Sequence, residues 1–261
     1  KHLLLVHSVL FLTVLLERFA FLMPQDFIYF ALPVSLAALL LSILISHRVA
    51  LCGAFIVTLI TAIMSGFRPD IILLSLLGNF VGVYATAGLR KRSQFLKVGA
   101  FIGIVNFVVI FGYWFLNNIS FRASAHLGAL GLANGFLMSV LIFFLVFFFE
   151  RAFKVTTDIT LLELSDLNHP LLKRMVLEAP GTYHHTLMIA NLCEAASEAI
   201  GANALLSRVG SYFHDIGKMA RSQFFTENES VQRTELGGTL QSPHEKLTPE
   251  RSKQIIMNHV T

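Results

Sequence analysis

Six of the ten histidines lie in residues 151–261, and three of these six lie on predicted helices in positions from which they could converge. His185 lies near the start of one segment and His259 lies on the last one. His214 directly precedes Asp215 near the end of the segment between them. Imidazole and carboxylate together suit Fe, Mn, Zn or Ni, and a carboxylate can bridge two metals. These residues are therefore candidates for a metal site.

The adjacent pair His214 and Asp215 restricts where such a site can lie. On a helix the two side chains point about 100° apart, so both reach the same metals only beyond the end of the helix. Gly217 follows directly and favours a helix end at this point. His184 points to another helix face and is the alternative to its neighbour His185 as the ligand.

Capping and breaking residues predict the helices that would carry these side chains. A turn over 180–182 precedes a helix over 183–200, and Asn203 caps a second helix that runs to about 216. Thr248 and Pro249 begin a third helix, because proline is favoured at the first helical position. Residues 220–247 are polar and form a long surface segment. Strand alternation is absent, so this part of the chain is expected to be all-α.

The first 150 residues have the composition of a membrane protein. The chain is 55% hydrophobic and 14% charged, whereas soluble domains carry about 25% charged residues. A membrane crossing takes about 20 mostly apolar residues. Six stretches qualify, at roughly 3–22, 28–46, 50–66, 71–89, 96–117 and 127–149.

The expected fold class is therefore all-α, a polytopic transmembrane helix bundle with six visible spans followed by a cytoplasmic all-α domain. We expect a transmembrane bundle over 1–150, a juxtamembrane connector over 151–178 and a separate domain over 179–261. The small-residue run 128–135 favours close helix packing in lipid. The only two cysteines, Cys52 and Cys193, exclude a disulfide scaffold.

Loop charges predict the orientation of the bundle. The loops on one side hold most of the bases, namely Lys1, Arg48, Arg90, Lys91, Arg92, Lys97, Arg151 and Lys154. The opposite loops hold Arg68 and Arg122 together with the acids Asp26 and Asp70. By the positive-inside rule the first side is the cytoplasm. The pI near 9.2 thus reflects loop charge and does not indicate a nucleic acid polymer as a partner.

Glu17 and Arg18 form the only ionisable pair inside a predicted span. A charge within the membrane is a candidate functional site, but long side chains near a helix end can also reach the interface as anchors. We expect the anchoring role. Because charged residues do not line the spans, a transporter with a regulatory tail has little support, and a sensor or anchor is favoured.

Beyond these patterns, the second half resembles the HD-domain metal-dependent phosphohydrolases, and more narrowly the seven-transmembrane receptor–HD hydrolases. The motifs that carry the resemblance occur in order: LLELSDLNHPLL at 161–172, APGTYHHT at 179–186, YFHDIGK at 212–218, FFTEN at 224–228 and SPHEKLTPERSKQIIMNHV at 242–260. That family joins an extracellular domain, seven membrane helices and a cytoplasmic HD domain. The order of bundle, connector and domain in this chain is similar.

The resemblance implies a role for each matching residue. His185 would bind one metal. His214 and Asp215 would be further metal ligands, with Asp215 bridging two divalent ions, most simply Fe or Mn. His259 would bind the second metal. Lys218 would lie near the substrate phosphate and stabilise charge there, so that Asp215 and Lys218 are the catalytic candidates.

The chain departs from the family pattern at three places. Glu229 stands where the family has Gln, and Ser242 stands where it has Asn before Pro-His. The family's remaining ligands, two histidines and an aspartate, are expected beyond His259, and one membrane helix and the extracellular domain are expected before Lys1. We therefore expect a fragment of a longer protein, with a C-terminally truncated HD domain that is inactive by itself.

The function implied by the resemblance is hydrolysis of cyclic di-AMP to the linear dinucleotide at the cell (inner or plasma) membrane. The expected partners are the cyclic dinucleotide, the lipid bilayer, a signal ligand outside or within the membrane, and a second copy in a homodimer. Two alternatives stay open: a catalytically inactive HD-domain receptor, and hydrolysis of cyclic di-GMP or a guanosine tetraphosphate-like nucleotide. No residue here identifies the base.

Overall fold

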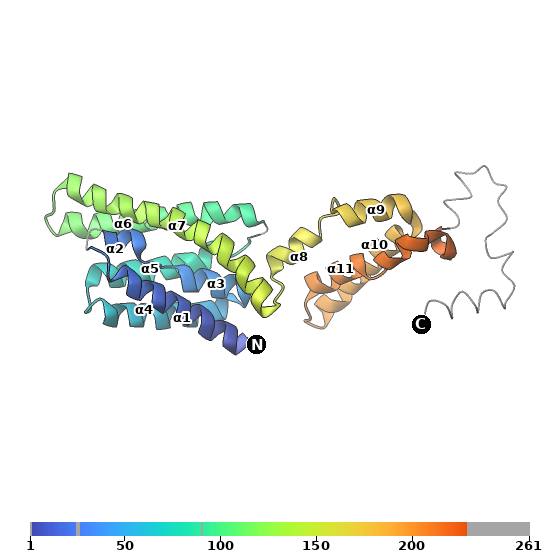
Figure 1. Ribbon diagram of the computed structural model, residues 1–261, viewed down its shortest axis with the longest axis horizontal. Helices are drawn as coiled ribbons and strands as arrows, with labels where there is room; N and C mark the ends of the chain where they lie inside the picture. The colour runs from blue at the N-terminus through green and yellow to red at the C-terminus, as the bar shows by residue number, and fades with distance from the viewer. Residues whose placement is uncertain (1, 25–26, 90, 229–261) are drawn as a thin grey trace. The chain divides into compact units, whose positions relative to one another are not determined.

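The computed structural model describes residues 2–24, 27–89 and 91–228, and all regular structure within them is helical, as expected. The chain divides into two compact units, Lys1–Thr160 and Leu161–Thr261. In Figure 1 the long helices of the first unit run alongside one another. The elements are α1 (His2–Ala20), α2 (Ile28–Ala31), α3 (Leu36–Leu44), α4 (His47–Met64), α5 (Pro69–Ala85), η2 (Arg92–Gln94), α6 (Phe95–Leu116), α7 (Phe121–Phe153), α8 (Asp158–Leu164), α9 (Pro170–Glu178), α10 (Pro180–Ala199), α11 (Ala204–Phe213) and η3 (Ile216–Phe224).

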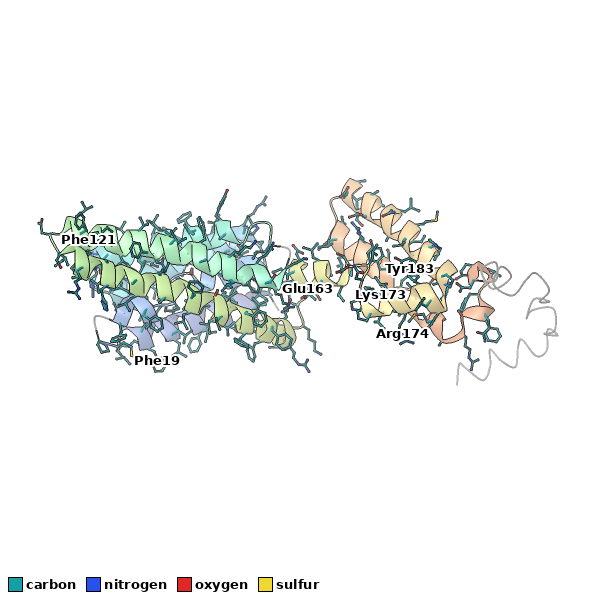
Figure 2. All side chains as sticks on the ribbon, turned by 90° about the horizontal axis from the view of Figure 1, so that it is seen from above. Phe19, Phe121, Glu163, Lys173, Arg174 and Tyr183 are labelled. Atoms are coloured by element: carbon teal, nitrogen blue, oxygen red, sulfur yellow. The ribbon has the colours of Figure 1, made fainter. Side chains whose placement is uncertain are left out.

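Among the described residues of the first unit, four helices are long and apolar enough to cross a membrane: α1, α4, α6 together with η2, and α7. The segments 28–44 and 69–85 are apolar but shorter. Large apolar side chains such as Phe19 and Phe121 stand exposed on the outside of the unit (Figure 2), as lipid contact requires. These features support a polytopic bundle, and the number of six spans stays a prediction.

The apolar stretch 28–46 is not one continuous helix, which corrects the sequence-based expectation. Pro33 lacks an N–H and disfavours a helical conformation at the residue before it, so α2 ends at Ala31 and α3 begins at Leu36. The amide of Asn134 on α7 donates to the freed carbonyls of Phe30 and Leu32, at 2.7 and 2.8 Å. A side chain therefore replaces the missing helical hydrogen bonds at a place where water is excluded.

Asn134→Leu is expected to destabilise the folded bundle by about 1–3 kcal/mol, because the carbonyl of Phe30 would lose its side-chain donor and the carbonyl of Leu32 would keep only the backbone N–H of Val34. Thermal unfolding in detergent measures the change. Asn117→Leu is the matched control, since the exposed Asn117 amide bonds only to the carbonyl of Tyr113 on its own helix. Equal melting temperatures for the two variants would contradict the stabilising role of Asn134.

Glycines let the backbones of α6 and α7 approach closely, as the small-residue run 128–135 predicted. A β-carbon on Gly135 would collide with the backbone of Gly103 and with the carbonyl oxygen of Gly99. A β-carbon on Gly103 would lie 2.7 Å from the carbonyl oxygen of Leu132. Small residues permit such backbone contact between helices in lipid.

Glu17 is buried, so the expectation that it anchors α1 at the interface is wrong. Its side chain is 0% exposed, and Oε1 accepts a hydrogen bond of 2.8 Å from the hydroxyl of Thr61 on α4. Arg18, one position further around the helix, is exposed. The rotation of α1 about its axis therefore directs Glu17 into the bundle and Arg18 out of it.

A polar cluster joins the end of α7 to the start of α8. Arg92 donates to Glu150 at 3.1 Å and to the Thr160 hydroxyl at 2.9 Å. The hydroxyls of Thr157 and Thr160 donate to the other oxygen of Glu150, at 2.5 and 2.7 Å. Ile159 packs into the core of the bundle. The first turn of α8 is thus held to the membrane unit.

The second unit is a small helical body built around α9, α10 and α11. Leu172 and Met175 of α9 pack with Ala190 of α10 and Tyr212 of α11. In Figure 2 the labelled Lys173 and Arg174 also mark α9. Two helix boundaries differ from the expected ones: α10 already begins at Pro180, which occupies the first helical position, and α11 ends at Phe213. The helix expected from Thr248 lies outside the described residues.

Candidate metal centre

The candidate ligands come together where α11 ends beside the first turns of α10. His185 lies on α10, and His214 is the first residue after α11. Asp215 then precedes the 3-10 helix η3, so the backbone direction changes between the two neighbours. This change of direction lets the side chains of His214 and Asp215 converge, although on a continuous helix they would diverge.

One imidazole nitrogen of each histidine faces the carboxylate of Asp215. Nε2 of His214 lies 3.3 Å from Oδ2 of Asp215, and Nε2 of His185 lies 3.9 Å from the same oxygen. One ligand atom from each of the three residues lies within 4.8 Å of the others, a grouping that can hold a metal ion. All three residues retain solvent access, with His185 44% exposed and Asp215 20% exposed.

A hydrogen bond orients the imidazole of His214 for this arrangement. Its Nδ1 lies 2.8 Å from the carbonyl oxygen of Ser211. Because a carbonyl oxygen only accepts, Nδ1 carries a proton, and in the neutral imidazole Nε2 is then the nitrogen free to bind a metal. The two histidine rings lie 5.8 Å apart, centre to centre, without blocking one another.

Lys218 lies between two carboxylates. Its Nζ donates to Oδ2 of Asp215 and to Oε1 of Glu227, in both cases at 2.8 Å. The ammonium group also stands 4.9 Å from the centre of the Phe225 ring. The cation is therefore held from three sides at the edge of the histidine cluster.

Charges in this group shift one another's proton affinities. The hydrogen bond to Asp215, followed by the one to Glu227, raises the pKa of the Lys218 ammonium. Burial raises the pKa of Asp215, but the hydrogen bond from Lys218 and the nearby histidines outweigh burial and bring this pKa below its usual value. The hydrogen bond from Lys218 likewise lowers the pKa of Glu227. Lys218, Asp215 and Glu227 are therefore all charged at neutral pH.

The structure brings together three of the four predicted metal ligands, His185, His214 and Asp215, and it places Lys218 against Asp215. His259 lies outside the described residues. His184, the alternative to His185, is absent from the cluster, and its ring contacts Tyr183 instead. The roles of these residues in binding and catalysis remain predictions.

Glu227 was missed at the sequence level. It belongs to the FFTEN motif, but a lone acidic residue in a polar segment does not indicate which cation it pairs with. Only its position beside Lys218 shows that it belongs to the site.

Two known protein families match successive parts of the chain. The family described as 7TM receptor with intracellular HD hydrolase matches residues 1–157, and the HD domain family matches residues 182–260. The two matches follow one another along the chain in the same order as the membrane unit and the histidine cluster.

Relatives with assigned names match nearly the whole chain. The cyclic-di-AMP phosphodiesterase PgpH of Bacillus subtilis is 38% identical over 248 residues, which are 92% of this chain and 34% of that protein. The Listeria monocytogenes protein of the same name is 36% identical over 89% of this chain and 32% of its own length. The chain thus spans about a third of the length of these relatives. The solved HD domain of L. monocytogenes PgpH in complex with cyclic-di-AMP is 52% identical, covers 36% of this chain and 41% of that chain, and has a TM-score of 0.29.

Proposed function

We propose that this chain, which belongs to the family of 7TM receptors with an intracellular HD hydrolase, forms part of a membrane-anchored, metal-dependent phosphodiesterase. The enzyme would open cyclic di-AMP to the linear dinucleotide. The observation that carries the proposal is the convergence of His185, His214 and Asp215. The nucleotide follows from the two relatives, both named cyclic-di-AMP phosphodiesterase.

The residues present fit a metal site chemically. Two imidazoles and a carboxylate suit Fe or Mn, and we propose that His185, His214 and Asp215, together with His259, would hold two such ions. When bound, the ions would activate water for attack and polarise the phosphoryl oxygens. The Ser211 carbonyl keeps the His214 imidazole oriented toward this site.

Lys218 stabilises the negative charge that develops on the phosphate. Its ammonium group lies 2.8 Å from Asp215 and therefore beside the proposed metals. A fixed positive charge at this position favours the transition state, where charge builds up on the phosphoryl oxygens. Hydrolysis consumes one water at one phosphodiester phosphorus and breaks one P–O bond, and the leaving ribose oxygen takes up a proton.

The membrane unit acts as anchor and sensor in this proposal. The basic loops support an inner or plasma membrane location with the HD domain on the cytoplasmic side. A signal ligand bound outside or within the bundle would act by favouring one arrangement of the 151–178 connector. The cluster around Glu150, which holds α8 to α7, lies at the start of this connector. A homodimer would place two connectors side by side.

Metal removal tests the proposal. The full-length protein in detergent is expected to hydrolyse cyclic di-AMP in preference to cyclic di-GMP. Turnover should fall to background after EDTA treatment and return when Mn²⁺ or Fe²⁺ is added back, because the nucleophile depends on the metal. Liquid chromatography of the linear product provides the measurement.

The alternatives are separate outcomes of the same assay. Absence of turnover with metal still bound would favour a receptor whose HD domain is inactive. Preference for cyclic di-GMP or a guanosine tetraphosphate-like nucleotide would retain the phosphohydrolase and overturn the substrate assignment.

A further inference from the structure

Residues 224–228, here called the strap, cross the N-terminal turn of α10. The backbone of the strap lies so close to α10 that a β-carbon on Gly181 would collide with the carbonyl oxygen of Glu227. Asn228 is 1% exposed, and its side-chain oxygen accepts a 3.0 Å hydrogen bond from the backbone N–H of Thr182. The Asn228 amide also donates to the Thr182 hydroxyl at 3.0 Å and to the Ser222 carbonyl at 3.3 Å. The strap is therefore fixed on α10 by specific contacts at both the backbone and the side chain.

The strap presents the carboxylate of Glu227 to Lys218. One oxygen of Glu227 accepts hydrogen bonds from Lys218 Nζ at 2.8 Å and from the Thr182 hydroxyl at 3.3 Å. Thr182 stands one turn before His185 on the same helix. A chain of contacts thus connects the ammonium group of Lys218 to the helix that carries a predicted metal ligand.

Lys218 needs a second carboxylate partner because Asp215 is expected to bind the metals as well as the lysine. The oxygens of Asp215 are expected to face the metals, which leaves them less available to hold a lysine. Lys218 has a flexible stem of four carbons, and without another partner its charge would sample several positions. Glu227 is anchored through Thr182 and keeps one partner oxygen beside Lys218 whatever Asp215 binds.

We propose that Glu227 is a positioning residue that holds the Lys218 ammonium at the metal centre for contact with the substrate phosphate. This inference rests on the proposed phosphodiesterase function. Glu227 acts through Lys218 and does not itself touch the reacting atoms. The close packing of the strap over Gly181 and the hydrogen bond from Thr182 hold this carboxylate beside Lys218.

The test is a double-mutant cycle in the full-length protein with Lys218→Met, Glu227→Ala and the combined variant. Glu227→Ala is expected to lower kcat by about 10–100-fold, the usual range for residues that orient a metal-site group. Metal content and KM should change little, because the predicted ligands stay in place. The combined variant should be no slower than Lys218→Met alone, since Glu227 has no further role once Lys218 is gone. Glu227→Gln should retain more activity than Glu227→Ala, because its amide oxygen still accepts a hydrogen bond from Lys218.

Acetylation of Lys218, measured by mass spectrometry, provides a readout that does not need turnover. Glu227→Ala should make this amine react fastest, and Glu227→Gln should still make it react faster than in the wild type, because a neutral amide oxygen accepts a weaker hydrogen bond from Lys218 than a carboxylate does. Glu227→Gln also preserves the shape of the side chain if Glu227→Ala fails to fold. Glu178→Gln is the matched control, because Glu178 pairs with Arg174 in an exposed ion pair on α9.

The possible results distinguish a failure of the positioning role of Glu227 from a failure of the proposed phosphodiesterase function. Full activity of Glu227→Ala, or losses that simply add in the combined variant, would overturn the positioning role. An unchanged acetylation rate in Glu227→Gln would overturn it as well. A wild-type protein without turnover would instead contradict the proposed function, and the acetylation rates would then decide on Glu227 alone.

Discussion

Replacement of Asp215 by alanine is expected to reduce hydrolysis of cyclic di-AMP by at least about 1,000-fold, since loss of even one oxyanion donor costs about 100–1,000-fold in other enzymes. The carboxylate lies 3.3 Å from His214, 3.9 Å from His185 and 2.8 Å from Lys218. Its removal therefore takes away the group that contacts each of the three other predicted site residues in the described part of the chain. Turnover of cyclic di-AMP and metal content by mass spectrometry should both fall.

Two neighbouring histidines provide the matched control for this prediction. His185→Ala should also lose metal, whereas His184→Ala should retain it, because only His185 faces Asp215. Both residues lie on α10 and both are exposed, so a general effect on the helix would affect the two variants alike. Full metal content in Asp215→Ala, or loss of metal only in His184→Ala, would contradict the assignment.

Gly135→Val is expected to give the largest loss of stability in the membrane unit. The first added carbon would already collide with the backbone of α6 at Gly99 and Gly103, and backbone cannot move aside as a flexible side chain can. Ordinary overpacking costs about 1–3 kcal/mol, and we expect this variant to exceed that range. The yield of monodisperse protein in detergent and its melting temperature measure the effect.

Gly112→Val is the control for this substitution. Gly112 lies on α6, the helix that Gly135 of α7 faces, but a β-carbon on Gly112 would meet nothing within 4 Å. Both variants thus add a valine side chain to an apolar helix, but only the one at Gly135 faces the backbone of another helix. Equal yields and melting temperatures would show that α6 and α7 do not pack as closely as the structure has them.

The local features of the chain were predictable from sequence because they depend on neighbouring residues. Asn203 caps α11 as expected, with its side chain accepting from the backbone N–H of Leu206. The apolar runs indicated the membrane helices, and the small residues near Gly135 indicated where two of them meet. The break at Pro33 was not predicted, because local composition alone does not show whether a buried partner such as Asn134 replaces the lost hydrogen bonds.

Some residues of the candidate site were likewise predictable from the sequence, and one was not. Residue type and position on predicted helices pointed to His185, His214 and Asp215 as metal ligands, and the resemblance to the HD hydrolases added Lys218 as a phosphate contact. Glu227 escaped notice because its partners, Lys218 and Thr182, meet it only when the strap crosses α10.

The all-helical class and the membrane half follow from the sequence alone, because they depend on composition and local periodicity, and the metal-binding candidates follow from residue type together with motifs shared with the HD hydrolases. That Glu17 faces inward to Thr61, that His185 rather than His184 meets Asp215, and that Glu227 holds Lys218 became visible only in the folded chain. Helix rotation and the packing of distant segments set these contacts. Such geometry is the outcome of burying many side chains at once, and a short stretch of sequence does not contain it.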